Sequence, residues 1–321
     1  MDDDRGVSGA LARLLDRGDL WLSRNLSDLT NAPVFGKLIT HSRISARGLL
    51  IAFAALILVC AIPPLTDWLL RKCKCVAPNF RGEVIPKAYG IAILACAAPL
   101  LLLDAFMYRS GASDRLVWIA CISVFAALGL LDDLIGDKQT KGLRGHLTAF
   151  LKDRRITTGL IKAVGGLLAA FAIGVALHRT EPLQILLVTG VVSLCANAMN
   201  LLDLRPGRAC GVFCALALLL LFTLWRQSSE FFVPGLLYIF VPALVAWTHD
   251  ADAHVMLGDT GSNLLGASIG LAVCLYFGPA VQVAALLLAM ALHILAERRS
   301  ITQIVEESRI LGAIDRLTGV R

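Results

Sequence analysis

Residues 129–137 read Gly129-Leu-Leu-Asp132-Asp133-Leu-Ile-Gly136-Asp137, and here an apolar segment of membrane length gives way to a basic loop. Three carboxylates lie within six residues at this boundary. Ionised carboxylates so close together at a membrane surface repel one another unless a cation lies between them. A solvated helix end accounts for the same residues, so the stretch alone leaves both metal or phosphate chemistry and simple solvation open.

The composition is that of an integral membrane protein. Of the 321 residues, 57% are hydrophobic and 17% are charged, whereas soluble domains average about 45–50% apolar and about 25% charged residues. The net charge of +6 does not indicate nucleic-acid binding, because basic residues of membrane proteins mark cytoplasmic loops and anionic headgroups. The nine cysteines lack the spacing of a disulfide framework or a zinc site, and we assign them no function.

Apolar runs recur at regular intervals, each close to the ~20 residues that a spanning helix needs. They cover 48–70, 89–108, 115–135, 158–178, 182–202, 209–225, 231–248, 262–277 and 280–296. We therefore predict an all-α, polytopic membrane bundle of about nine transmembrane helices, formed by residues 47–296. Residues 1–46 are expected to be an amphipathic surface helix or a poorly ordered extension, and residues 297–321 a cytosolic C-terminal tail.

Basic residues concentrate in alternate connections. The loops at 71–87 and 136–158 and the tail after 296 are rich in lysine and arginine, whereas the connections between them are short and almost uncharged. The positive-inside rule places the basic set in the cytoplasm. The polar motifs fall on this side, so distant helices are expected to deliver their polar ends to one cytoplasmic surface of the cell membrane.

One such motif is Gly258-Asp259-Thr-Gly261-Ser262, which precedes an apolar run. Free backbone N–H groups at a helix start favour phosphate oxygens, and Asp259 is the hard oxygen ligand that Mg²⁺ requires. An ordinary N-terminal cap with a solvated aspartate is the alternative.

A second motif comprises Asn197, Asn200 and Asp203, which are spaced three apart and so share one helical face. The amides suit a ribose, a nucleobase edge or an amide-bearing sugar. Hydrogen bonding between packed membrane helices is the alternative.

Three basic residues near these motifs are candidates for binding phosphate. Arg205 and Arg208 follow Asp203 directly and could pair with phosphate, or simply obey the positive-inside rule. Lys162, about one turn into its apolar run, is a countercharge to the aspartates or to a substrate phosphate, or else it extends to the headgroups.

Taken together, these residues resemble the polyprenyl-phosphate N-acetylhexosamine-1-phosphate transferases, the superfamily of phospho-MurNAc-pentapeptide translocase and the UDP-GlcNAc:undecaprenyl-phosphate GlcNAc-1-phosphate transferases. The resemblance runs from about residue 79 to the end of the last apolar run. It rests on Asn79-Phe-Arg-Gly82 through Pro86 to Gly90, the Asp132-Asp133 pair, the Asn197–Asp203 run and Gly258–Ser262.

The resemblance implies that the phosphate of undecaprenyl phosphate attacks the β-phosphate of a UDP-amino sugar, giving lipid diphosphate-sugar and UMP with Mg²⁺ as cofactor, in the initiation of a cell-envelope glycan. A phospho-enzyme route stays open beside direct attack, which we favour because a phosphate monoester is largely ionised near neutral pH. The implied catalytic residues are Asp132, Asp133 and Asp259, and the implied metal ligands are Asp259 and Asp132. The implied substrate-binding residues are Asn197, Asn200, Asp203, Lys162, Arg205, Arg208, Gly261 and Ser262.

The chain departs from the family pattern after Asp203. Leu204 and Pro206 stand where the family usually has Gly and Asp, so altered nucleotide recognition is expected. The histidine-rich last cytosolic loop of the pentapeptide translocases is absent, which argues against that branch. A catalytically silent relative that binds polyprenyl lipid is the alternative, a transporter of an anionic solute is less favoured, and a homodimer is left open.

Overall fold

The computed structural model describes residues 46–136, 154, 157–227 and 235–320. Nearly all of them belong to one compact unit, Leu50–Ser228 with Phe232–Arg321. A second unit comprises Met1–Leu49 with Ser229–Phe231, and the structure describes only residues 46–49 of it. The predicted N-terminal extension therefore lies outside the described residues except for Ala46, as does most of the basic loop at 136–158, including Asp137.

Helices make up almost all of the regular structure in the described part of the chain, which confirms the all-α prediction. Nine long helices correspond one to one to the predicted apolar runs, with ends that differ by at most four residues. They are α3 (Ala46–Lys72), α4 (Gly90–Met107), α5 (Ala112–Ile135), α7 (Thr158–Leu177), α8 (Pro182–Leu202), α9 (Arg208–Gln227), α10 (Gly235–Ala251), α11 (Gly258–Tyr276) and α12 (Pro279–Arg298).

Seven of these helices are long and apolar enough to cross a membrane, counted over the described residues: α3, α4, α5, α7, α8, α9 and α12. Large apolar side chains point outward from them, such as Leu168 on α7 and Leu288 on α12, which are 62% and 73% exposed. Such surfaces suit lipid rather than water. The chain is therefore a multi-pass membrane protein.

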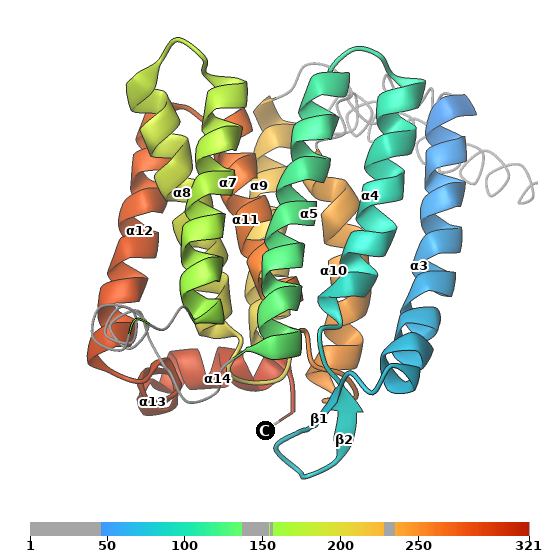
Figure 1. The fold of residues 1–321 in the computed structure, drawn as a ribbon, viewed down its shortest axis with the longest axis vertical. Helices are drawn as coiled ribbons and strands as arrows, with labels where there is room; N and C mark the ends of the chain where they lie inside the picture. Colours follow the sequence, from blue (N-terminus) through green and yellow to red (C-terminus); the bar gives the residue numbers. More distant parts are fainter. Residues whose placement is uncertain (1–45, 137–153, 155–156, 228–234, 321) are drawn as a thin grey trace, which may run out of the picture. The chain divides into compact units, whose positions relative to one another are not determined.

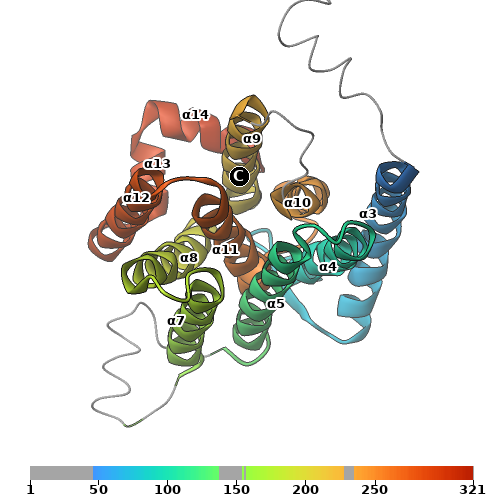
Figure 2. The same ribbon diagram turned by 90° about the horizontal axis from the view of Figure 1, so that it is seen from above.

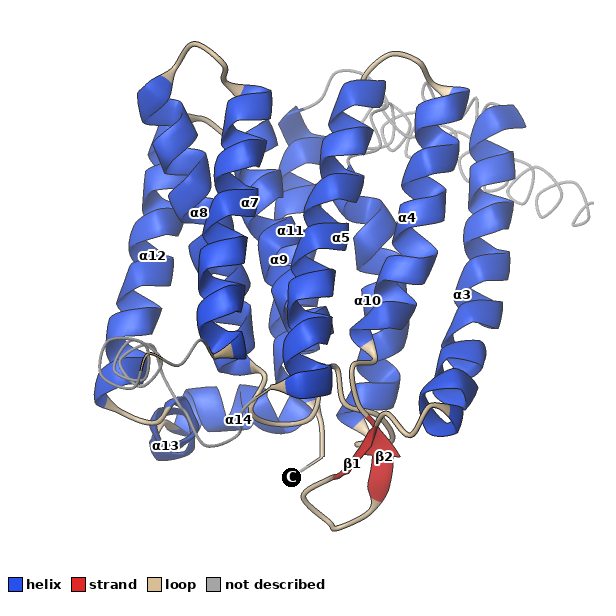
Figure 3. Ribbon diagram, in the orientation of Figure 1, coloured by secondary structure: helices blue, strands red, loops and turns tan. Residues whose placement is uncertain are grey.

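Successive long helices run in opposite directions, so their connections alternate between the two ends of the bundle (Figure 1). The lower end in Figure 1 carries a short antiparallel hairpin, β1 (Val76–Pro78) and β2 (Val84–Pro86), in which Val76 pairs with Pro86. These strands are the exception to the helical structure in Figure 3. We call this end, where the basic connections gather, the basic end.

Helix α11 forms the centre of the bundle, with α4, α5, α8, α9, α10 and α12 around it (Figure 2). All residues from Thr260 to Cys274 are buried. Its glycines allow neighbouring backbones to approach closely, as is usual between membrane helices: a Cβ on Gly266 would lie 2.2 Å from the carbonyl oxygen of Cys195 on α8. Because α11 is shielded from lipid, it tolerates the polar residues of its first turn.

Two short helices, α13 (Ile301–Glu307) and α14 (Arg309–Thr318), follow α12 across the basic end (Figure 1). The guanidinium of Arg208 donates hydrogen bonds to both carboxylate oxygens of Asp315, at 2.6 and 3.0 Å. The indole of Trp247 donates to the carbonyl oxygen of Thr318 at 2.7 Å. The predicted C-terminal tail is thus packed against the starting turn of α9 and the last turn of α10.

Candidate active site

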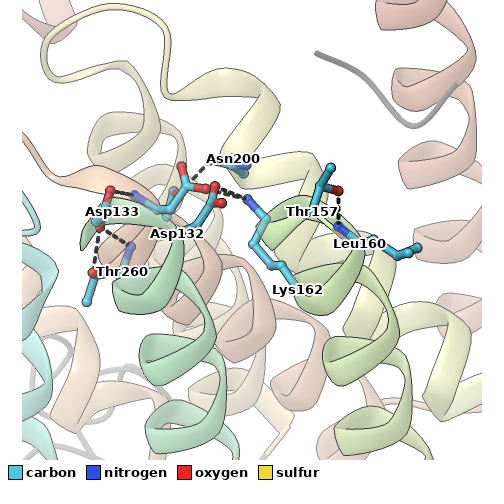
Figure 4. A network of polar contacts seen from close by, with 9 residues as sticks. Asp132, Asp133, Thr157, Leu160, Lys162, Asn200 and Thr260 are labelled. Atoms are coloured by element: carbon cyan, nitrogen blue, oxygen red, sulfur yellow. Dashed lines mark hydrogen bonds and ion pairs between the residues drawn. The ribbon is translucent and has the colours of Figure 1, made fainter. Parts of the chain in front are cut away.

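The end of α5 and the start of α11 are joined through the carboxylate of Asp133 (Figure 4). One oxygen accepts a hydrogen bond from the backbone N–H of Asp259 at 3.0 Å, and the other accepts from the N–H of Thr260 at 2.9 Å and from its hydroxyl at 2.6 Å. The first N–H groups of a helix have no partner within that helix. Asp133 therefore caps α11 from a neighbouring helix.

Gly258 makes this capping contact possible. Its φ is +73°, and a Cβ at this position would lie 2.6 Å from a carboxylate oxygen of Asp133. The glycine therefore supplies both the left-handed backbone and the open space that the carboxylate needs.

Lys162 places its ammonium group between two carboxylates that come from different helices. The lysine lies in the second turn of α7, a helix that begins where Thr157 accepts a hydrogen bond from the N–H of Leu160. Its Nζ lies 3.5 Å from Asp132 at the end of α5 and forms an ion pair with Asp259 at the start of α11. The three side chains are only 17–24% exposed, so water screens their attraction less than at an open surface.

Asn200, near the end of α8, completes this cluster. In the amide orientation that matches donors to acceptors, its Nδ2 donates to Asp259 at 2.8 Å and to the hydroxyl of Ser262 at 3.1 Å, and its Oδ1 accepts from Lys162 at 3.0 Å. We call Asp132, Lys162, Asn200 and Asp259 the charged cluster. It draws one residue from each of α5, α7, α8 and α11.

The motif between Asn79 and Gly90 supports the start of α11. Pro86 accepts a hydrogen bond from the N–H of Met256, and the N–H groups of Tyr89 and Gly90 donate to the carbonyl oxygens of Met256 and Leu257. A Cβ on Gly90 would lie 2.1 Å from the Cα of Gly261. Gly261, predicted to bind substrate, is therefore packed against backbone.

Ser262, also predicted to bind substrate, is fully buried. Its hydroxyl contacts the amide of Asn200. This contact places Ser262 to hold Asn200 in position. Direct contact between Ser262 and the substrate stays a prediction.

Asp203 lies directly after α8, at the basic end. Burial raises the pKa of its carboxyl well above the usual range, and the nearby carboxylates of Asp250, Asp259 and Asp133 raise it further. Asp203 thus lies in the electrostatic field of the charged cluster.

Asp250 connects the segments on either side of this region. It is 4% exposed, and its oxygens accept hydrogen bonds from the N–H of Gly207 at 2.8 Å and from that of Leu257 at 3.2 Å. It therefore ties the turn after α8 to the segment that begins α11.

Three other predicted substrate residues have protein partners. Asn197 is exposed and contacts the ring of His293 on α12 at 2.7 Å. Arg205 pairs with Glu306 at 3.2 Å, and Arg208, which is 4% exposed, pairs with Asp315. Their roles toward substrate stay predictions.

The donor set of the charged cluster fits Mg²⁺ held together with a phosphate ligand. Among the residues that the structure describes, no three His, Cys, Asp or Glu side chains are grouped to hold a metal ion. Asp132 and Asp259 nevertheless face one cation, the ammonium of Lys162. Mg²⁺ is usually bound by one or two carboxylates, with water and substrate phosphate completing its shell.

Sequence reasoning missed the roles of Lys87 and Asp250 in this site. Lys87 donates from Nζ to the carbonyl oxygen of Asp133, next to the cap on α11. Its position inside the Asn79–Gly90 motif was an available indication. From the sequence we assign Asp250 no role, and only the fold reveals its burial.

Comparison with known proteins identifies the family. The sequence model of glycosyl transferase family 4 matches residues 115–277, which run from the first turn of α5 to the end of α11 and include every residue of the charged cluster. A search of curated proteins finds no match to this chain. Because the match covers half of the sequence, the chain belongs to glycosyl transferase family 4, a family of sugar-phosphate-transferring enzymes.

Proposed function

We propose that this protein transfers an N-acetylhexosamine 1-phosphate from a UDP-sugar to undecaprenyl phosphate and releases UMP, at the cytoplasmic face of the cell membrane. The observation that carries the proposal is the charged cluster, in which Lys162 lies between Asp132 and Asp259 at the basic end of a membrane bundle. A reaction between a lipid phosphate and a soluble nucleotide needs charged groups at this depth, where the headgroup and the cytosol meet.

The proposed reaction exchanges one phosphorus–oxygen bond for another. An oxygen of the lipid phosphate attacks the β-phosphorus of the UDP-sugar, and the bond from that phosphorus to the oxygen bridging it to UMP breaks. The bridging oxygen leaves with its electron pair as part of UMP, so neither oxidation nor reduction occurs. Catalysis of such a transfer consists mainly of positioning and charge neutralisation.

The residues of the charged cluster supply both of these functions. The ammonium of Lys162 neutralises phosphate charge, and its contacts with Asp132 and Asp259 fix its position. The amide of Asn200 orients Lys162 and Asp259 relative to each other. Asp133 holds the first turn of α11, and with it Asp259, in register with α5.

The cofactor that we propose is Mg²⁺, held by Asp259 and Asp132. Bound there, it would neutralise diphosphate charge as a Lewis acid. Asp203, beyond the cluster, is proposed to lie toward the nucleotide.

The test incubates the purified full-length protein with undecaprenyl phosphate, Mg²⁺ and UDP-GlcNAc, in parallel with other UDP-sugars, and measures UMP release. We expect turnover with at least one UDP-sugar and its loss in the Asp259→Asn variant. The matched control is Asp252→Asn, because Asp252 is an exposed acid seven residues earlier in the same region; this variant should retain wild-type turnover. No UMP with any sugar, or an undiminished rate in Asp259→Asn, would contradict the proposal.

The second candidate function is a catalytically silent relative that binds polyprenyl phosphate. The observation that favours it is the partnering of Arg205 and Arg208 with C-terminal acids beside the unusual Leu204 and Pro206. This candidate predicts saturable binding of undecaprenyl phosphate without UMP release from any UDP-sugar.

A further inference from the structure

Helix α14 presents an apolar face to its surroundings. Ile310, Ile314 and Leu317 are 73%, 54% and 83% exposed, and their spacing of four and three residues puts them on one side of the helix. In water such a row of branched side chains is unfavourable. We therefore expect an apolar partner to cover this row.

The opposite face of α14 is bound to the bundle, so the apolar row points away from these contacts. On that face Gly312 is buried, and Asp315 is held by both hydrogen bonds from Arg208. The carbonyl oxygen of Thr318 accepts a hydrogen bond from Trp247 on α10. A rotation of α14 that buried the apolar row would break all of these contacts.

The location of α14 matches the boundary between lipid and water. In Figure 1 the helix lies across the basic end, roughly at right angles to the spanning helices. Figure 2, which looks along those helices, shows α14 at the outer edge of the bundle, reaching from α13 toward α9 with most of its length not covered by a spanning helix. The side of α14 that faces the bilayer is thus open to lipid.

Charge and shape around α14 also fit a phospholipid. Arg309 and Arg316 lie seven residues apart on one flank of the apolar row, and neither forms an ion pair with another described residue. An open groove of about 710 Å³ next to Leu317 is lined in part by Leu244 and Trp247, with Arg316 and Asp252 as its charged lining residues. Apolar walls beside a guanidinium match an acyl chain attached to a phosphate headgroup.

From these observations we infer that α14 is a membrane-interface helix that binds anionic phospholipid of the surrounding bilayer. Ile310, Ile314 and Leu317 insert among the acyl chains, and Arg309 and Arg316 contact headgroup phosphates. The amphipathic pattern, with apolar and cationic residues on adjoining faces, is typical of helices that lie in the plane of a membrane surface. This inference is independent of the proposed enzymatic activity.

Site-specific photo-crosslinking tests the inference. The photoreactive residue benzoylphenylalanine replaces Ile314 or Leu317 in the full-length protein, which is reconstituted in nanodiscs of phosphatidylcholine with or without phosphatidylglycerol and irradiated. Mass spectrometry then identifies the adducts. The control position is Gln303 on α13, which is exposed and polar. A second pair of samples carries R309Q/R316Q.

We expect phospholipid adducts at 314 and 317 well above those at 303. Phosphatidylglycerol should be enriched about fivefold over its share of the bilayer, the factor that corresponds to the attraction of one basic residue by an anionic membrane surface. R309Q/R316Q should remove the enrichment for phosphatidylglycerol but keep the phospholipid adducts. Equal capture at 303 and 314, adducts to a second copy of the chain, or capture only of added undecaprenyl phosphate would overturn the inference.

Discussion

A carboxylate oxygen of Asp133 on α5 accepts two hydrogen bonds from Thr260 on α11, one from the backbone N–H at 2.9 Å and one from the hydroxyl at 2.6 Å. The two residues are 127 positions apart in the chain. Because Asp259 precedes Thr260 directly, this contact fixes the position of the carboxylate that we propose as a metal ligand. The second aspartate of the Asp132-Asp133 pair thus positions the site, while the first belongs to the charged cluster.

The Asp133→Asn variant should lose stability. An asparagine side chain keeps one acceptor oxygen but turns an NH₂ group toward the N–H donors of α11, and it removes the negative charge that favours a helix start. We expect a loss of about 1–3 kcal/mol in the free energy of unfolding, measured by thermal or denaturant unfolding in detergent. Thr260→Ser is the control because it retains both donor groups and loses only a buried methyl group, which costs about 0.8 kcal/mol, so it should lose less stability than Asp133→Asn. An Asp133→Asn protein as stable as the wild type would contradict the capping role.

The close contact of α5 with α11 gives a second prediction. A Cβ on Gly129 would lie 2.1 Å from the backbone oxygen of Asp259, and neither backbone can move without displacing a packed helix. Gly129→Ala should therefore displace the first turn of α11 and destabilise the protein by about 1–3 kcal/mol. It should also reduce UMP release more strongly than its effect on stability would explain.

The control for Gly129→Ala is Gly166→Ala on α7. There a new Cβ would meet only the ring of Phe125, at 3.4 Å, and alanine favours the helical backbone. This variant should match or exceed the wild type in unfolding temperature and activity. A Gly129→Ala protein that behaves in the same way would show that the approach of α5 to α11 does not position Asp259.

Local patterns predicted the helices and the end at which the site forms. Apolar runs of membrane length are properties of contiguous sequence, so the bounds of α3 to α12 agree with the predicted runs to within four residues. Alternating basic connections likewise predicted that Asp132, Asn200 and Asp259 would share one end of the bundle. Their position at the same end as Lys162 follows from chain direction together with helix length.

The partners of individual side chains did not follow from the sequence, because they depend on how distant helices rotate and pack. Nothing near Arg208 indicates that its partner is Asp315, 107 residues away. The burial of Asp250 likewise requires the turn after α8 and the start of α11 to meet. The end of the bundle at which the site residues lie was therefore predictable, whereas the partner of each side chain was not.

Lys162 provides a third prediction, on cation binding. Lys162→Gln removes the positive charge between Asp132 and Asp259, so a divalent cation meets two carboxylates without a competing ammonium. We expect Mn²⁺, a spectroscopic substitute for Mg²⁺, to bind roughly tenfold more tightly, which equals about 1.4 kcal/mol, as measured by electron paramagnetic resonance. UMP release should fall about 100-fold, because a preorganised charge on the phosphate is lost.

The Lys162→Arg variant keeps the positive charge and is the control for cation affinity. It should bind Mn²⁺ about as weakly as the wild type. Unchanged or weaker Mn²⁺ binding by Lys162→Gln would show that the lysine does not compete with a cation for the two aspartates.

The attachment of α14 to α9 gives a fourth prediction. Asp315→Asn leaves the guanidinium of Arg208, which is 4% exposed, without its carboxylate partner. Removing one partner of a buried ion pair lowers the free energy of unfolding by about 3–5 kcal/mol. Glu306→Gln is the matched control, because it breaks the Arg205 pair, whose side chains are 36% and 60% exposed. An exposed pair contributes about 0–1 kcal/mol, so the two variants should differ clearly in unfolding temperature, and similar values would contradict a structural role for Asp315.

The raised pKa of Asp203 predicts how stability depends on pH. Burial and the carboxylates of Asp250, Asp259 and Asp133 raise its pKa in the folded state above the unfolded value, which is about 4. As pH rises between these two values, the unfolded chain gives up the proton first, so the contribution of Asp203 to stability falls. Asp203→Asn, which mimics the neutral acid, should unfold like the wild type below about pH 4 and at a higher temperature than the wild type at pH 7.5. Unfolding scans of both proteins in Mg²⁺-free detergent measure this difference in unfolding temperature. If the difference between Asp203→Asn and the wild type does not grow with pH, the carboxyl is ionised in the folded protein as readily as in the unfolded chain.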